Sequence, residues 1–158
     1  MIDPTTLPYR PCAGVMLLNR EGKVFVGQRF DTVLEAWQMP QGGIDPGEDA
    51  RAAALRELRE ETGVAADQVE LVAEAPEELT YDLPPEMVGK VWKGKWRGQR
   101  QRWFLFRLRG DDSAVDIATP EPEFRAWRWV DPAELPALIV PFKQQLYRDV
   151  AAAFEDHL

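Results

Sequence analysis

The sequence predicts an α/β or α+β fold in which helices cover a mixed sheet. Most of the chain consists of short β-prone segments, which are interrupted by one long run of strong helix formers. An amphipathic helical segment follows the last β-prone segment. With 158 residues and 45% apolar content, the chain has the size of one domain, so we expect a single domain over 1–158. This size argues against a disordered tail and against a two-domain enzyme.

The first predicted element is a β-hairpin near the N-terminus. Residues 13–18 form an apolar run, residues 19–22 have the composition of a turn, and residues 23–28 are a returning β-prone run. We expect the Pro- and Gly-rich residues 39–47 that follow to form a loop.

A helix is expected over 48–62, where strong helix formers continue up to Gly63, a residue type common at helix C-termini. Further β-prone segments predict strands at 69–73, 79–82, 101–108 and 125–130. In the last of these strands Trp127 and Trp129 share a face, and we interpret them as core residues rather than as a platform for stacking bases.

The C-terminal part of the chain predicts a packed helix. Asp131 and Pro132 open a short helical turn, and apolar residues then recur at steps of four, at Phe142, Leu146, Val150 and Phe154. The stripe favours a helix over 142–154 that lies against the core.

Composition excludes several classes of function. The single cysteine, Cys12, cannot form an internal disulfide, and the single histidine, His157, is next to the C-terminal residue. These counts argue against a Cys-rich zinc site and against a Ser-His-Asp triad. No apolar run approaches the roughly 20 residues of a membrane helix, and the first residues lack the features of a signal peptide. We expect a soluble protein in the reducing cytoplasm.

The formal net charge of −8 argues against a uniformly positive surface that coats nucleic acid or anionic lipid. The charge is unevenly distributed, because residues 43–86 carry thirteen acids and three bases whereas residues 87–110 carry eight bases and no acid. Two solvated faces would explain this pattern. A site that holds cations on one wall and phosphates on the other would explain it equally.

Three glutamates of the predicted helix, Glu57, Glu60 and Glu61, stand at spacings that place them on one side, and Leu55 and Leu58 share another face. We expect the leucines to face the core and the carboxylates to point away from it. Like charges at these spacings destabilise a helix by a few tenths of a kcal/mol per pair, and a hard cation such as Mg2+ reverses that effect. Without further context, an exposed Glu-rich face offset by Arg56 and Arg59 explains the cluster better than a metal site does.

The context is a motif from Gly42 to Val64. Gly42 is followed after five residues by Glu48, and after seven more by Arg56-Glu57-Leu58-Arg59-Glu60-Glu61-Thr62-Gly63-Val64. This pattern resembles the Nudix box at every fixed position. The resemblance implies an α/β/α sandwich around a mixed sheet, and hydrolysis of a nucleoside diphosphate linked to another moiety. It also implies that Glu57, Glu60 and Glu61 are metal ligands, whereas Gly42, Glu48 and Arg56 shape the loop and hold the helix.

Segments outside the box resemble one branch of that family, the bacterial RNA pyrophosphohydrolases together with the dinucleoside tetraphosphate hydrolases. The segments that carry this resemblance are Tyr9-Arg10-Pro11, Trp37 to Ile44, Leu79 to Pro84, Gly98 to Phe104, Pro122-Glu123-Phe124 and Pro141-Phe142-Lys143. The resemblance implies that Glu123 is a fourth metal ligand with a catalytic role, like the three glutamates of the helix. It implies substrate contacts at Arg10, Arg29, Gln41, Tyr81, Gln99, Phe142 and Lys143.

The residues themselves allow other roles for some of these positions. Phe142 also begins the apolar stripe of the last helix, while Lys143 and Arg29 are also compatible with ordinary surface positions. The segment 91–100 interleaves aromatic and basic residues, a pattern that suits single-stranded nucleic acid or polyphosphate but also a mobile loop with exposed lysines.

The resemblance implies Mg2+-dependent hydrolysis of phosphoanhydride bonds, with Mn2+ or another divalent cation as a substitute. The expected substrate is RNA with a 5'-triphosphate or 5'-diphosphate, converted to the 5'-monophosphate at the start of mRNA decay. The alternative is a dinucleoside polyphosphate such as diadenosine tetraphosphate, which would give ATP and AMP. No membrane or DNA partner is expected.

The expected mechanism is attack of an activated water on a phosphorus, with its proton taken by one of the glutamates. Spacing alone does not identify that base. Two rivals stay open: a Nudix enzyme for ADP-ribose or an oxidised nucleotide, and a nucleotide-binding module without activity.

Overall fold

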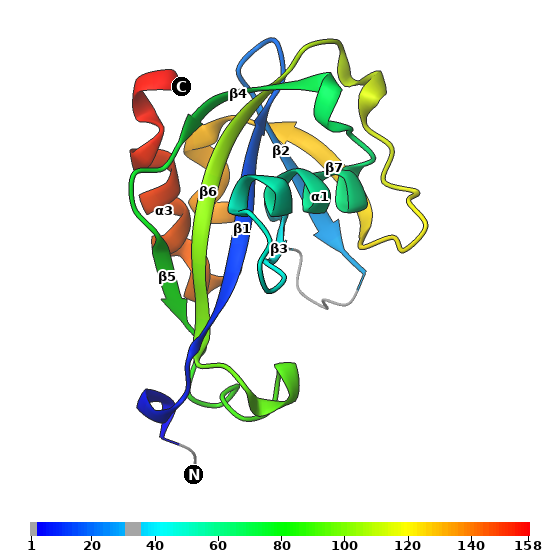
Figure 1. Ribbon diagram of the computed structural model, residues 1–158. Coiled ribbons are helices and arrows are strands. Elements are labelled where there is room, and N and C mark those ends of the chain that lie inside the picture. Colours follow the sequence, from blue (N-terminus) through cyan, green and yellow to red (C-terminus); the bar gives the residue numbers. More distant parts are fainter. Residues whose placement is uncertain (1–2, 31–35) are drawn as a thin grey trace.

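The computed structural model describes residues 3–30 and 36–158, and within them seven strands form one sheet that carries three helices (Figure 1). The strands are β1 (Tyr9–Leu18), β2 (Val24–Arg29), β3 (Gln41–Gly43), β4 (Val69–Glu74), β5 (Leu79–Asp82), β6 (Gly98–Leu108) and β7 (Phe124–Val130). The helices are α1 (Ala50–Thr62), α2 (Leu135–Leu138) and α3 (Gln144–Ala153). Most predicted elements are present, with ends that differ by a few residues.

The sheet is mixed, as predicted. Its main strand order is β4-β6-β1-β2-β7, with β3 paired to β1 and β5 paired to β6. The whole of β1 pairs with β6 in parallel, whereas the other strand pairs are antiparallel. Two long central strands thus extend together to one end of the molecule (Figure 1).

The two faces of the sheet are covered by different helices, which confirms the α/β/α sandwich (Figure 1). Alternate residues of β1 pack on opposite faces, since Val15 and Leu17 join the cluster that includes Leu58 of α1. Met16 and Leu18 join the cluster that includes Leu146, Tyr147 and Val150 of α3. Three residues of the expected stripe, Leu146, Val150 and Phe154, are therefore buried. Phe142 is only half-buried and lies in the short 3-10 turn before α3, which begins at Gln144.

The predicted loop at 39–47 contains a short strand, β3, so that part of the prediction was wrong. The hairpin between β1 and β2 is paired in register only at Leu18 and Val24, next to the turn. Beyond this point β3 hydrogen-bonds to β1, and Gln38 bridges to Gly27 of β2. Glycine and proline made this segment resemble a loop, but pairing with strands already in place determines its conformation.

Helix α1 has well-defined ends. The Asp49 side chain accepts a hydrogen bond from Ala52 N at 3.1 Å, so the helix begins at Ala50 rather than at Glu48. Gly63 ends it in the left-handed conformation, with φ of 76°.

Trp127 and Trp129 pack on the α1 face of the sheet, in agreement with their interpretation as core residues. The Phe25 ring lies 5.6 Å from Trp127 and 6.1 Å from Trp129, measured between ring centroids. Among the described residues, no helix is long and apolar enough to cross a membrane.

Candidate active site

A cavity of about 620 Å³ opens beside the shared ends of β1, β5 and β6. Its wall brings together residues that are far apart in the sequence. It includes all the predicted substrate contacts, Arg10, Arg29, Gln41, Tyr81, Gln99, Phe142 and Lys143, together with Gly42 and two predicted metal ligands, Glu57 and Glu123.

Three adjacent strands supply one row of this wall. Gln99 of β6 is paired with Arg10 of β1 on one side and with Tyr81 of β5 on the other. Paired residues of neighbouring strands project to the same face, so a cation, an amide and a phenol face the cavity side by side. The parallel pairing of β1 with β6 is what brings Arg10 and Gln99 together.

The Gln99 amide is fixed by a chain of buried hydrogen bonds along β6. Trp103 Nε1 donates to Gln101 Oε1 at 2.8 Å, and Gln101 Nε2 donates to Gln99 Oε1 at 2.7 Å. An indole nitrogen can only donate, so it sets the orientation of both amides. We infer that Gln99 offers its N–H2 group, rather than its carbonyl, to an acceptor atom in the cavity.

Aromatic and cationic groups lie together at another part of the wall. The Tyr81 and Phe142 ring centroids are 5.9 Å apart, and Lys143 Nζ lies 5.1 Å from the Tyr81 centroid. Phe142 contacts the core and also lines the cavity, so it is not solely a core residue. Burial, and then the nearby Arg29, lower the pKa of Lys143 to about 8. Within residues 3–30 and 36–158, no carboxylate pairs with this ammonium group.

The glutamates of α1 do not all point away from the core, which corrects the expectation from their spacing. Glu60 is exposed, but Glu57 retains only 8% of its accessible surface and Glu61 retains none. Leu58 is buried and Leu55 is only half-buried. Helical spacing located the cluster on one side, but the extent of burial depends on how α1 sits against the sheet and β3.

Arg56 is the counter-charge for the exposed side of the cluster. It donates to Glu48 Oε1 at 2.9 Å, to Glu57 Oε1 at 2.8 Å and to the Gly43 carbonyl at 2.9 Å, and its guanidinium lies 3.4 Å from Glu60. The ion pair with Arg56 holds the pKa of Glu48 at about 2. These contacts tie the loop after β3 to α1.

Glu61 lies on the inner side of the cluster, and among the described residues it forms no ion pair. Both of its carboxylate oxygens are buried without a hydrogen-bond partner. Burial raises its pKa well above the usual range, and the charges of Glu123 and Glu57 raise it further. A buried carboxylate without a partner, beside two others, has the chemistry of an oxygen ligand for a hard cation.

Across the described ranges, no three acidic, His or Cys side chains converge closely enough to hold a metal ion as they stand. Glu123 lies 3.8 Å from the Arg29 guanidinium, and Glu60 lies beside Arg56. In this arrangement arginines neutralise the outer members of the acidic cluster, and the inner one, Glu61, lacks a partner.

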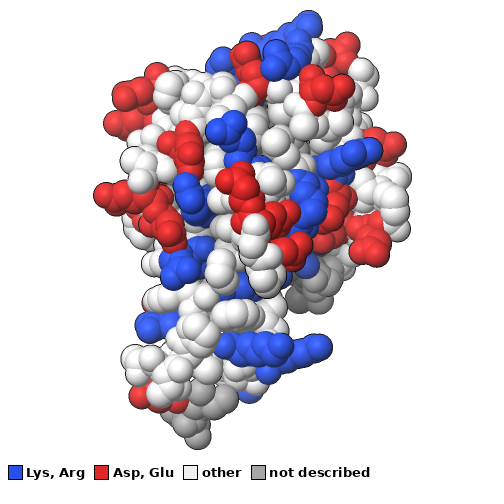
Figure 2. Space-filling view, viewed as in Figure 1, with Lys and Arg blue, Asp and Glu red and all other residues white. Residues whose placement is uncertain are grey.

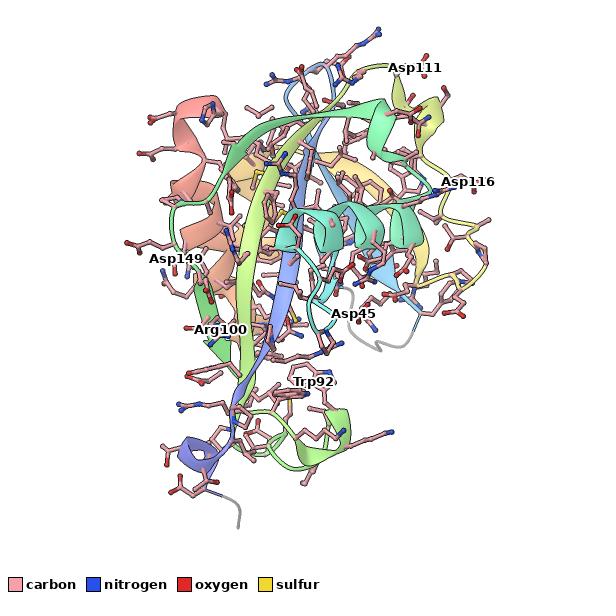
Figure 3. The ribbon with its side chains drawn as sticks, viewed as in Figure 1. Asp45, Trp92, Arg100, Asp111, Asp116 and Asp149 are labelled. Carbon is pink, nitrogen blue, oxygen red and sulfur yellow. The ribbon has the colours of Figure 1, made fainter. Side chains whose placement is uncertain are left out.

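Sequence reasoning missed several residues at this site. Gln38, Leu83, Met87 and Ile139 line the cavity, and none of them was predicted as a site residue. Val91 and Trp92 also line it, and both belong to the segment 91–100 that the sequence analysis singled out. A second cavity of about 610 Å³ adjoins it, because both are lined by Arg10, Gly43 and Glu57. Trp96 and Asp45 line this second cavity, and in the view of Figure 3 Trp92 lies below Asp45. The interleaved aromatics of 91–100 were the signal for Trp92 and Trp96, whereas the apolar residues carried none.

Comparison with known proteins agrees with this geometry. The model of the NUDIX domain family matches residues 8–150. The chain belongs to the NUDIX family. Among its relatives, the protein named RNA pyrophosphohydrolase of Cereibacter sphaeroides is 60% identical over 157 residues, which is 99% of this chain and 97% of the relative. The protein of the same name from Sphingopyxis alaskensis is 63% identical and covers 98% of each chain.

Solved structures with the same NUDIX fold are more distant in sequence. The Ap4A hydrolase of C. elegans, in a binary complex, has a TM-score of 0.66 at 22% identity, with 93% of this chain and 98% of that chain covered. The dihydroneopterin triphosphate pyrophosphohydrolase of E. coli has a TM-score of 0.67 at 22% identity, covering 90% and 96% of the two chains. At this identity the likeness establishes the fold alone.

NUDIX hydrolases are generally dependent on a divalent metal. In this NUDIX chain, the box spans β3, the loop that follows it and α1. Gly43 and Glu57 line both cavities, and Glu48 and Arg56 line the second one.

Proposed function

We propose that this chain is an RNA pyrophosphohydrolase that converts 5'-triphosphate or 5'-diphosphate RNA ends to 5'-monophosphate ends. The observation that carries the proposal is the 60–63% identity, over nearly the whole chain, to relatives of that name. The cavity supports it, because carboxylates lie on one part of its wall and aromatic rings beside a lysine lie on another. A 5'-terminal nucleotide with its phosphates has matching parts, a base that stacks and a chain of anions.

In this proposal Glu57, Glu60, Glu61 and Glu123 hold Mg2+, and Mn2+ substitutes for it. The unpartnered oxygens of Glu61 support the assignment, since a divalent cation would supply the charge that the buried carboxylate lacks. When bound, the cation neutralises the phosphates and promotes ionisation of the attacking water.

The protein groups then position the substrate. Arg10 and the Gln99 amide contact phosphate oxygens, and Phe142 and Lys143 hold the terminal bases. Water attacks a phosphorus, the bond to the leaving phosphate oxygen breaks, and a cluster carboxylate accepts the proton of the water. Of the three glutamates on α1, only Glu57 lines the cavity, which favours it over Glu60 and Glu61 for contact with the reacting groups.

The test is an assay of the whole chain with Mg2+ on triphosphorylated RNA, diadenosine tetraphosphate and ADP-ribose side by side. We expect release of pyrophosphate or successive phosphates from RNA, a 5'-monophosphate product, and loss of turnover in EDTA that Mg2+ restores. Faster hydrolysis of either other substrate would overturn the assignment to RNA, and hydrolysis of none would favour a binding module.

A second arm tests the ligand set. Glu60→Gln should remove most turnover and leave the fold intact, because Glu60 is exposed and only its interaction with Arg56 is lost. The matched control is Glu155→Gln, which neutralises an exposed carboxylate at the far end of α3. Near-normal activity of Glu60→Gln in Mg2+ would contradict the metal-ligand assignment.

A further inference from the structure

The segment 87–97, which we call the basic segment, forms part of the rim of the main cavity. It contains Lys90, Lys93, Lys95 and Arg97 and has no acidic residue. Its apolar side chains, Met87, Val88, Val91 and Trp92, pack against the core cluster on the α3 side of the sheet. This packing fixes the segment beside the cavity.

Backbone hydrogen bonds also hold the basic segment in place. Arg97 N donates to the Pro8 carbonyl at 3.0 Å, and Leu83 N donates to the Arg97 carbonyl at 2.8 Å. Trp92 and Lys93 both adopt the left-handed conformation, with φ of 51° and 58°, which is uncommon for residues other than glycine. With this backbone, Trp92 lies on the cavity wall and Lys93 is exposed. An ordered surface loop with such a backbone is a candidate for function.

The lysines of this segment differ from most other cations of the same region in having no acidic partner. Arg97, Arg100 and Arg102 each form an ion pair, with Asp82, Glu78 and Glu74 respectively. Lys90, Lys93 and Lys95 are exposed, and among the described residues none of them forms an ion pair or a side-chain hydrogen bond. Figure 2 shows Lys and Arg side chains projecting from the lower part of the molecule, where this segment lies.

We propose that the basic segment binds the phosphates of single-stranded RNA downstream of the terminal nucleotides held in the cavity. This inference rests on the proposed function and specifies the substrate as an RNA chain rather than a dinucleoside polyphosphate. The segment combines three unpaired positive charges with Trp92 at the cavity and Trp96 beside the adjoining one, which matches a backbone of phosphates interleaved with bases. A dinucleoside polyphosphate has no further phosphates beyond its second nucleoside, so it gains nothing from these lysines.

The experiment compares the wild-type chain with Lys90→Gln/Lys93→Gln/Lys95→Gln. The substrates are a triphosphorylated dinucleotide, a triphosphorylated RNA of about 20 nucleotides and diadenosine tetraphosphate. We expect kcat/KM to fall about tenfold for the long RNA and to stay unchanged for the two short substrates. Binding of 5'-monophosphate RNA, measured by fluorescence anisotropy, should depend less on salt, and the slope of log Kd against log salt should fall by about 2.

The matched control is Arg20→Gln/Lys23→Gln/Arg148→Gln, which removes three positive charges elsewhere. Arg20 and Lys23 flank the turn between β1 and β2, at the opposite end of the sheet from the basic segment (Figure 1). This control should keep the wild-type preference for long RNA, and thermal melting should find both triple variants folded.

Two outcomes would overturn the inference: an unchanged kcat/KM for the long RNA, or an equal loss for short and long substrates. Failure of the proposed function has a separate signature, because the wild-type chain would then hydrolyse diadenosine tetraphosphate faster than RNA, or would hydrolyse neither RNA. In that case the anisotropy measurement still tests whether the three lysines bind RNA.

Discussion

Gly42 and Glu57 lie so close together that any side chain at position 42 would displace the Glu57 carboxylate. A Cβ atom at that position would lie 2.1 Å from Glu57 Cδ and 2.3 Å from its Oε2. The first glycine of the box therefore makes room for one of its glutamates, and β3 can press against α1 with the carboxylate between them.

The change Gly42→Ala should displace the Glu57 side chain from its contact with Arg56 and from the cavity. We expect kcat/KM for triphosphorylated RNA to fall at least about tenfold, and the free energy of unfolding to fall by about 1–3 kcal/mol. Gly110→Ala is the control, because a Cβ atom there would meet nothing within 4 Å. Wild-type activity in Gly42→Ala would mean that turnover does not depend on where the Glu57 carboxylate lies.

Glu61 should make the stability of the metal-free chain depend on pH. Burial raises the pKa of the Glu61 carboxyl above its value in the unfolded chain, which is about 4.5. The contribution of this group to stability is therefore fully present below pH 4.5 and is lost as pH rises through the folded-state pKa. Glu61→Gln removes this ionisation. In EDTA the variant should be more stable than the wild type, by roughly 1–3 kcal/mol, above the folded-state pKa.

The measurement is urea unfolding from pH 5 to pH 9, with EDTA or with Mg2+. If Glu61 is a metal ligand, Mg2+ should stabilise the wild type more than the variant, and the variant should lose turnover. Parallel stability curves for the two proteins would contradict both parts of this prediction.

Lys143 should make substrate binding depend on pH at the alkaline end. Its pKa is lowered to about 8, so its ammonium group loses its charge well below the usual value of 10.5. We expect KM for a triphosphorylated dinucleotide to rise as pH passes 8. Lys143→Gln should have a higher KM that is flat over this range, and Lys143→Arg should retain a low KM to pH 10. The same alkaline rise in all three proteins would show that another group is responsible.

Trp103 should act on the substrate through Gln101 and Gln99. Trp103→Phe keeps an aromatic ring but removes the donor that orients both amides, so Gln99 is no longer held with its N–H2 group toward the cavity. We expect KM to rise several-fold with a smaller change in kcat. Trp129→Phe is the control, because Trp129 Nε1 has no hydrogen-bond partner in the described structure. If Trp103→Phe and Trp129→Phe change KM equally, Trp103 contributes only packing and does not orient Gln99.

Local patterns were sufficient for much of the fold. Helix α1 was predicted within two residues of each end from Gly63 and the helix formers before it. Strand β7 was predicted equally closely from the alternation around Trp127 and Trp129. These signals are short-range, because capping, helical spacing and strand alternation depend on neighbours in the sequence. The strand β3 has no such signal, since its conformation comes from hydrogen bonds to β1.

The motifs identified which residues belong to the site. How these residues are arranged in space depends on the fold and could not be read from the motifs. All the predicted substrate contacts line one cavity together with Glu57 and Glu123, whereas Glu60 and Glu61 do not, and the individual roles stay predictions. The expected direction of the glutamates was wrong for Glu57 and Glu61. A helical pattern gives the angle between side chains and does not say which neighbouring element will cover them.

The sequence by itself determined the box, its acidic helix, the adjoining basic stretch and which segments are helices or strands for most of the chain. Each of these features depends only on residue type and on spacing between neighbours in the sequence. Only the tertiary structure decided that β1 runs parallel to β6, which places Arg10 beside Gln99, and that Trp103 orients that amide from four residues away. It also decided that Glu61 is buried without a partner while Arg56 neutralises Glu60. These relationships depend on contacts between distant segments, and burial and hydrogen bonding there exist only once the sheet has assembled.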